Sequence, residues 1–142
     1  MLIKFKKLNP DARLPVYASS GAACFDLCAV HDALVHPGTT MLVSTGLAFE
    51  VPDGNALLVY PRSGLALRGL RLANCVGVVD SDYRGDVMIA LHNDSRDAML
   101  VKAGDRIAQG MVVPVARHGF VESKDLSSTA RGEGGFGSTG VS

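Results

Sequence analysis

Short runs of aliphatic and β-branched residues, separated by turn-forming residues, recur along most of this 142-residue chain. They occupy residues 39–54, 55–63, 75–80, 86–93 and 105–116. Apolar and small polar residues roughly alternate in the first run, as they do when one face of a strand is buried. No apolar stripe with helical spacing persists beyond two turns. Many short strands joined by turns predict an all-β fold, either a barrel or a jelly roll.

One segment, RSGLALRGLRLA at residues 62–73, is compatible with a helix, and it is short. The chain length suits one domain with a substantial core. There is no internal repeat and no segment with the composition of a domain linker. The expected fold therefore has at most one short helix.

The charge of the chain is balanced, with 14 Lys and Arg against 14 Asp and Glu. Broad binding to nucleic acid or to a membrane surface usually requires a basic excess, so neither partner is expected. The local cluster of Arg62, Arg68 and Arg71 is more typical of a solvated loop than of a binding groove. The N-terminus lacks the apolar core of a signal peptide, and no stretch approaches 18 apolar residues. These features predict a cytoplasmic protein.

Three cysteines, Cys24, Cys28 and Cys75, are present. An odd number without a secretory signal indicates free thiols. Cys24, Asp26 and Cys28 fall on one face of a predicted strand, which suggests either a metal site or small buried thiols. No further Cys or His pair completes tetrahedral spacing, and this favours the thiols.

The C-terminus contains RGEGGFGSTG at residues 131–140. So much glycine is typical of disorder, because glycine loses the most backbone entropy on ordering. A flexible linker seldom carries an arginine and an aromatic ring five residues apart, here Arg131 and Phe136. Arginine pairs with phosphate, and phenylalanine stacks on a base. The segment is therefore either a disordered tail or a nucleotide clamp.

Another polar segment interrupts the apolar strands at NCVGVVDSDYRGDV, residues 74–87. One interpretation is a hairpin turn built from its Asp and Gly residues. The other is that Asp80, at the end of an apolar strand, is a rigidly held general base.

Three more segments carry similarly ambiguous signals. PRSGLA at residues 61–66 has the components of a phosphate-binding loop. GDRIAQG at residues 104–110 is compatible with a functional motif and equally with a plain turn that enters a strand. AACFDLCA at residues 22–29 places Asp26 in an apolar strand, where an unpaired carboxylate is costly to bury.

The order of these five segments resembles the five motifs of the trimeric dUTPases, deoxyuridine triphosphate nucleotidohydrolases. The resemblance runs from near residue 20 to the end of the chain, and the segments at 61–66, 77–85 and 131–140 are highly specific together. It implies a β jelly-roll-like barrel assembled as a homotrimer, in which residues 1–128 form the domain and residues 129–142 form a mobile arm that closes over the site. Each active site would draw motifs from three subunits.

The resemblance also implies an activity: Mg²⁺-dependent hydrolysis of dUTP to dUMP and pyrophosphate, which limits uracil incorporation into DNA and supplies dUMP for thymidylate synthesis. Asp80 would activate the water that attacks the α-phosphorus. Asp26 would reach the metal through water, while the triphosphate holds the Mg²⁺. Arg131 would meet the γ-phosphate, and Gln109 would contact the phosphates.

The remaining implied contacts bind the substrate. Asn74 and the backbone leading to Tyr83, including Gly77, would form the uracil pocket, and the ring of Tyr83 would exclude a 2′-hydroxyl. The other substrate contacts implied are Arg62, Ser63 and Gly64 to phosphate, Phe136 over the uracil, and Gly137, Ser138 and Thr139 to the β- and γ-phosphates.

Two positions depart from the family pattern, which usually has glycine in place of Cys24 and an aliphatic residue in place of Gly110. They put the local backbone geometry in question and leave the polar groups intact. Two other functions remain as alternatives. A dCTP deaminase would carry a different motif around Asp80, with glutamate as the base. A non-catalytic nucleotide-binding switch would not need Asp80 or the tail.

Overall fold

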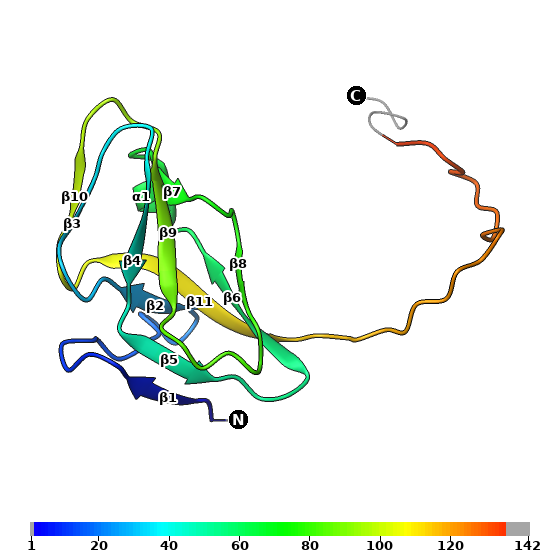
Figure 1. Ribbon diagram of the computed structural model, residues 1–142, viewed down its shortest axis with the longest axis horizontal. Coiled ribbons are helices and arrows are strands. Elements are labelled where there is room, and N and C mark those ends of the chain that lie inside the picture. The colour runs from blue at the N-terminus through cyan, green and yellow to red at the C-terminus, as the bar shows by residue number, and fades with distance from the viewer. Residues whose placement is uncertain (1, 136–142) are drawn as a thin grey trace.

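A computed structural model of the chain describes residues 2–135 and shows an all-β architecture with one short helix (Figure 1). The strands in chain order are β1 (Lys4–Lys7), β2 (Phe25–Cys28), β3 (Ala33–Val35), β4 (Thr40–Ser44), β5 (Leu47–Glu50), β6 (Asn55–Tyr60), β7 (Leu70–Leu72), β8 (Gly77–Val79), β9 (Met88–Asn93), β10 (Met99–Val101) and β11 (Arg106–Pro114). The helix, α1 (Ser63–Ala66), lies between β6 and β7. No helix within residues 2–135 is long and apolar enough to cross a membrane.

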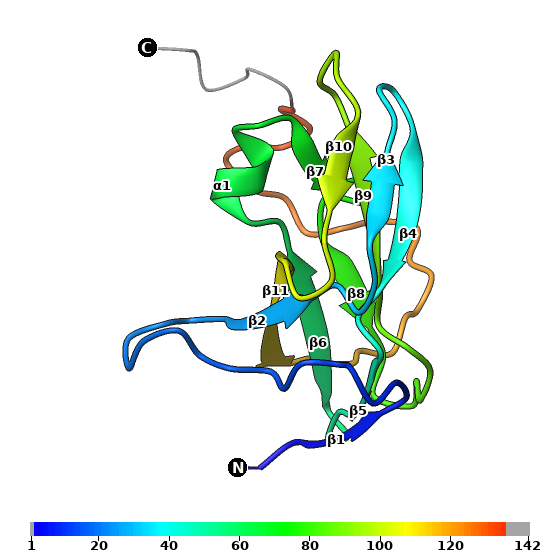
Figure 2. The same cartoon turned by 90° about the vertical axis from the view of Figure 1, so that its left-hand side faces the viewer.

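All the paired strands run antiparallel and form two larger and two smaller sheets. The four-stranded sheet has the order β2-β11-β6-β8, and the three-stranded sheet has the order β4-β9-β7. The pairs β1-β5 and β3-β10 complete the body of the molecule (Figure 2). After β11 the chain leaves this body as a long extended segment (Figure 1). The sheets therefore form a framework in which the polar motifs lie partly on loops and partly, at Asp26 and Gln109, on the strands β2 and β11.

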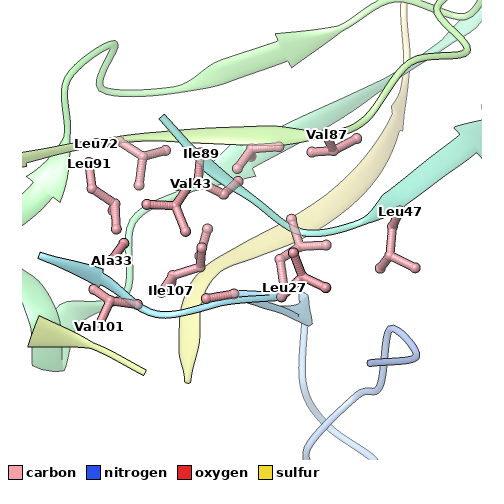
Figure 3. Packing of buried hydrophobic residues seen from close by; sticks show 14 of the residues in the cluster. Leu27, Ala33, Val43, Leu47, Leu72, Val87, Ile89, Leu91, Val101 and Ile107 are labelled. Atoms are coloured by element: carbon pink, nitrogen blue, oxygen red, sulfur yellow. The ribbon is translucent and has the colours of Figure 1, made fainter. Parts of the chain in front are cut away.

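The core lies where the sheets face each other, and aliphatic residues from many strands meet there (Figure 3). Strand β9 shows the underlying alternation. Ile89, Leu91 and Asn93 are buried, whereas Met88, the first residue of the strand, is exposed. Such alternation buries one face of a strand and leaves the other for polar groups. The strands expected from alternation are confirmed, and so is the all-β class.

The segment expected to be helical is helical only at Ser63–Ala66. Gly69 ends it with a φ of +89°, and a Cβ at Gly69 would lie 3.1 Å from the backbone nitrogen of Ser95. Leu70 and Leu72 then alternate with exposed Arg71 and pair with β9 as β7. The prediction of a helix through residue 73 was wrong because the alternating Leu70 and Leu72 lie on a strand that pairs with β9.

Gly110 has a packing role that accounts for one departure from the family pattern. It lies opposite Phe25 in the β2-β11 register, and a Cβ at Gly110 would lie 2.7 Å from the Phe25 ring and 3.1 Å from Leu57 Cδ1. The ring also meets Phe49 at a centroid distance of 5.8 Å. The missing side chain of Gly110 therefore makes room for the phenylalanine.

Gly110→Ala should lower the free energy of unfolding by about 1–3 kcal/mol, because the added methyl overpacks the core. Urea unfolding at fixed chain concentration measures this change. The double substitution Phe25→Leu with Gly110→Ala should recover part of the loss. Gly21→Ala is the control, since a Cβ there meets nothing within 4 Å. Equal stability of Gly110→Ala and the wild type would contradict the packing argument.

Candidate active site

A pocket of about 300 Å³ lies beside β8 and β9 and contains four of the predicted site residues. Its lining residues are Val59, Leu72, Asn74, Gly77, Val78, Val79, Asp80, Tyr83, Asp86, Val87, Met88, Ile89 and Ala90. Apolar side chains make up most of the wall, and a few polar groups converge on it. Such a lining suits a small planar ligand that needs a limited number of directed contacts. We refer to it as the nucleoside pocket.

The loop between β8 and β9 supplies the polar edge of this pocket. It is not a hairpin turn, because β8 pairs with β6 whereas β9 pairs with β4 and β7. The loop thus crosses between two sheets, which corrects the hairpin interpretation. Asp80 begins it directly after β8, and its backbone oxygen accepts a hydrogen bond from the Tyr83 N–H at 3.2 Å. No side-chain hydrogen bond or ion pair within residues 2–135 engages the Asp80 carboxylate.

Tyr83 is held by its own loop. Its hydroxyl donates to the backbone oxygen of Asp86 at 3.0 Å, and its ring lies so close to Gly85 that a Cβ there would be 2.6 Å from Tyr83 Cζ. Arg84 Nη1 donates to the backbone oxygens of Ser81 at 2.7 Å and of Tyr83 at 2.9 Å. The ring orientation therefore depends on a compact loop that glycine makes possible.

The opposite edge of the pocket is shaped by Asn74 and Gly77. A Cβ at Gly77 would lie 3.2 Å from Val59 Cβ and 3.4 Å from Asn74 Nδ2, so glycine leaves room for the amide. Cys75, which lies between them, has a φ of +61°, and the Val76 N–H donates to the backbone oxygen of Asn74 at 2.6 Å. This tight turn points the chain back toward the strand. Cys75 is an exposed free thiol, whereas Cys28, one of the two cysteines expected to be buried, is buried.

A second, more polar pocket of about 260 Å³ forms where β6 leads into α1. It is lined by Arg62, Ser63, Gly64, Leu65, Arg68 and Gln109. Gln109 Nε2 donates to the Pro61 oxygen at 2.9 Å and so attaches β11 to the start of this loop. A guanidinium, a hydroxyl and backbone N–H groups suit an anion such as phosphate. We refer to it as the phosphate loop.

Asp26 lies beside this loop and is paired with two arginines. Its Oδ1 is 3.3 Å from Arg62 Nε, and its Oδ2 is 3.2 Å from Arg106 Nη1. Arg62 Nη1 also donates to the Arg106 backbone oxygen at 3.2 Å. Gln109 is the register partner of Asp26 across β2 and β11. The cost of placing this carboxylate in an apolar strand is therefore offset by two ion pairs.

The cysteines near Asp26 do not form a metal site with it. The β2-β11 register shifts between Arg106 and Ala108, and Cys28 is buried next to Leu27, so the alternation expected for Cys24, Asp26 and Cys28 ends there. Burial raises the pKa of the Cys28 thiol, which disfavours the thiolate that a metal needs. Residues 2–135 contain no cluster of three His, Cys, Asp or Glu side chains suited to a metal.

Arg131 is the last predicted site residue that the structure describes. Its Nε donates to the Gly134 oxygen at 2.7 Å, and the Gly134 N–H donates to the Arg131 oxygen at 3.2 Å. The extended segment after β11, which contains Arg131, runs away from the sheets (Figure 1). The predicted contacts of Phe136, Gly137, Ser138 and Thr139 lie outside the described residues.

Comparison with known proteins shows which family this arrangement belongs to. The sequence model of the dUTPase family matches residues 11–140. The chain belongs to the dUTPase family. It is 45% identical over 141 residues to the deoxyuridine 5'-triphosphate nucleotidohydrolase of Nautilia profundicola, and this alignment covers 99% of each chain. It is 49% identical over 144 residues to the Azoarcus sp. protein of the same name, covering 97% of each.

A solved structure agrees with the family assignment. A mutant dUTPase of Staphylococcus bacteriophage 80alpha with dUpNHpp matches with a TM-score of 0.88 and 25% identity, covering 99% of each chain. The family expected from the five motifs is thereby confirmed, and so is an all-β fold with one short helix.

The site residues divide between the two pockets of this dUTPase-family chain. Asn74, Gly77, Asp80 and Tyr83 line the nucleoside pocket, whereas Arg62, Ser63, Gly64 and Gln109 line the phosphate loop. The two linings have no residue in common. Two further arginines lie at these residues: Arg106, which the sequence did not single out, pairs with Asp26, and Arg68, which was interpreted as part of a solvated loop, lines the phosphate loop. A basic residue directly after the Gly-Asp turn of residues 104–105 is the signal that would have indicated Arg106.

Proposed function

We propose that this protein hydrolyses dUTP to dUMP and pyrophosphate in the cytoplasm. The observation that carries the proposal is the nucleoside pocket, in which Asp80, Tyr83 and Asn74 converge on one cavity. Its volume of about 300 Å³ suits a nucleoside. The phosphate loop adds the anion-binding groups that a triphosphate requires.

The nucleoside pocket would select the base and the sugar. The Asn74 amide and the backbone through Gly77 would pair with the uracil edge and leave no space for a 5-methyl group. The Tyr83 ring would lie under the deoxyribose, where a 2′-hydroxyl would collide with it. Discrimination by such a collision needs a ring that cannot move aside, and the hydrogen bond from Tyr83 to Asp86 supports that requirement.

Asp80 would carry the chemistry. Its carboxylate would accept a proton from a water as that water's oxygen attacks the α-phosphorus, and the bond from this phosphorus to the bridging oxygen of the pyrophosphate would break. Phosphoryl transfer depends on position and charge more than on covalent catalysis, so one rigid base suffices. The free carboxylate at the end of β8 suits this role because no other described side chain competes for it.

The phosphate loop and Asp26 would manage the charge of the triphosphate. Arg62, Ser63, Gly64 and Gln109 would contact the phosphates. Mg²⁺ typically keeps several waters and binds through one or two carboxylates together with substrate phosphates. Among residues 2–135, Asp26 has no surrounding cluster of metal-ligating side chains, which fits a metal that arrives with the substrate. Bound there, Mg²⁺ would neutralise charge on the phosphates, and Asp26 would orient its waters.

A homotrimer with a jelly-roll subunit would complete each site. The nucleoside pocket and the phosphate loop have separate linings, so in a trimer the pocket of one subunit would face the loop of another. Apolar side chains of the extended segment are almost fully exposed in the single chain, Phe120 at 99% and Val121 and Leu126 at 91% each. Contact with a neighbouring subunit would bury them.

The proposed division of the chain follows from the same assembly. Residues 1–128 would form the trimeric catalytic domain, and residues 129–142 would form an arm that closes over a neighbour's site. Arg131 would meet the γ-phosphate, Phe136 would cover the uracil, and Gly137, Ser138 and Thr139 would donate to the β- and γ-phosphates.

Pyrophosphate release from dUTP, UTP, dTTP, dCTP and dATP with Mg²⁺, run side by side, tests the function. We expect turnover of dUTP alone, its loss with EDTA, and dUMP as the nucleotide product. Ammonia release from dCTP would indicate a deaminase instead. Binding of dUTP without turnover would indicate a nucleotide-binding switch. Either result would overturn the proposed activity.

A further inference from the structure

We propose that Ser44 at the end of β4 and Thr45 directly after it hold the Asp86 carboxylate and the adjacent Val87 backbone, and thereby position Tyr83 for sugar discrimination. The sugar-discriminating role of Tyr83 belongs to the proposed function, and the inference rests on it to that extent. Neither Ser44 nor Thr45 belongs to the five motifs. We refer to Ser44, Thr45 and Asp86 together as the hydroxyl clamp.

The contacts of the clamp are made by side chains from two distant parts of the chain. Ser44 Oγ donates to Asp86 Oδ2, and Thr45 Oγ1 lies 3.4 Å from Asp86 Oδ1. The Thr45 hydroxyl donates its single proton to the Val87 backbone oxygen at 2.8 Å, so it holds the residue after Asp86, while the Asp86 carboxylate accepts its hydrogen bond from Ser44. Within residues 2–135 Asp86 takes part in no ion pair, so hydroxyls are the groups that hold its charge.

The clamp itself is anchored in the core. Thr45 has no exposed surface, and the Gly46 N–H donates to Ser44 Oγ at 2.9 Å. The Val87 N–H donates to the Leu47 oxygen at 2.8 Å, which joins the two segments through the backbone as well. The buried Thr45 hydroxyl fixes the Val87 backbone, and the Ser44 hydroxyl fixes the neighbouring carboxylate, so neither group has much freedom to move. The position of Asp86 is therefore set by β4 and the turn after it.

The position of Asp86 is transmitted to Tyr83 through one hydrogen bond. Its hydroxyl donates to the backbone oxygen of Asp86 at 3.0 Å, and its ring lies over Gly85. The Tyr83 side chain is 46% exposed, so no packed wall holds the ring from outside. A shift of the Asp86 backbone would release the hydroxyl and let the ring tilt away. A tilted ring would leave room for a 2′-hydroxyl, which would raise activity toward UTP relative to dUTP.

Thr45→Val keeps the shape of the side chain and removes the hydroxyl. We expect the ratio of kcat/KM for dUTP to kcat/KM for UTP to fall about two- to tenfold, the equivalent of one hydrogen bond. Ser44→Ala should act in the same direction. Thr45→Ser restores the hydroxyl and should restore the ratio. Thr40→Val is the matched control, since Thr40 lies at the other end of β4 and its hydroxyl contacts His92 Nδ1 at 2.9 Å.

A second readout follows Tyr83 without any need for turnover. The chain has three tyrosines, so ¹³C-labelled tyrosine gives a simple spectrum in which Tyr83→Phe identifies the Tyr83 signal. The signal should shift in Thr45→Val and Ser44→Ala and stay in place in Thr40→Val. An unchanged signal and an unchanged substrate ratio in both clamp variants would overturn the inference. A shifted signal in a protein that does not hydrolyse dUTP would support the positioning and refute the proposed function.

Discussion

Asp80→Asn is expected to lower kcat for dUTP by about 10²–10⁴-fold, the range that a positioned general base contributes. The amide has nearly the shape of the carboxylate but accepts no proton from water. The Asp80 side chain makes no hydrogen bond or ion pair with another described residue, so the substitution breaks no contact that holds the loop. Affinity for a non-hydrolysable dUTP analogue should therefore change little. Steady-state kinetics and calorimetric binding measure the two effects separately.

Asp82→Asn is the matched control for this experiment. Asp82 lies two residues away in the same loop, carries the same charge and does not line the nucleoside pocket. It should retain near-normal turnover. If Asp80→Asn kept normal kcat, Asp80 would not be the base. If the two variants lost activity equally, the effect would come from the charge of the loop rather than from proton transfer.

Strand positions and the polar motifs were predictable because both depend on local sequence. Alternation along residues 86–93 predicts one buried face, and Ile89 and Leu91 occupy it. Turn residues at 104–105 likewise predict the entry to β11. Local signals of this kind need no knowledge of which strands become neighbours.

The sequence pattern could not predict which strands pair with one another. The segment after Asp80 has the composition of a hairpin turn, yet β8 and β9 join different sheets. The pairing of Asp26 with Arg106 spans 80 positions, and Ser44 meets Asp86 across 42. Such contacts depend on sheet order, which short-range periodicity does not encode. In the proposed trimer, the assembly of the two pockets into one site would depend further on neighbouring subunits.

Removal of residues 129–142 is expected to lower turnover of dUTP on the order of 10³-fold, by analogy with an arginine supplied to a transferring phosphoryl group. The last strand within residues 2–135 ends at Pro114, so the described part of the removed segment contains no strand. Thermal unfolding and the oligomeric state should therefore match those of the full chain. Full activity of the truncated protein would contradict the nucleotide clamp and favour the alternative that the glycine-rich segment is a disordered tail.

Two positions of the proposed arm test two different properties. Substitutions of Arg131 test its charge, and a substitution of Phe136 tests whether the arm closes over the base. Arg131→Ala should reproduce most of the loss in kcat, whereas Arg131→Lys should recover part of it, because lysine keeps the charge and loses the bidentate geometry. Arg117→Ala is the matched control in the same exposed segment. Since the chain has no tryptophan, Phe136→Trp places a single fluorophore on the arm. Its emission should change when a non-hydrolysable dUTP analogue binds, and an unchanged emission would exclude stacking of residue 136 on the base.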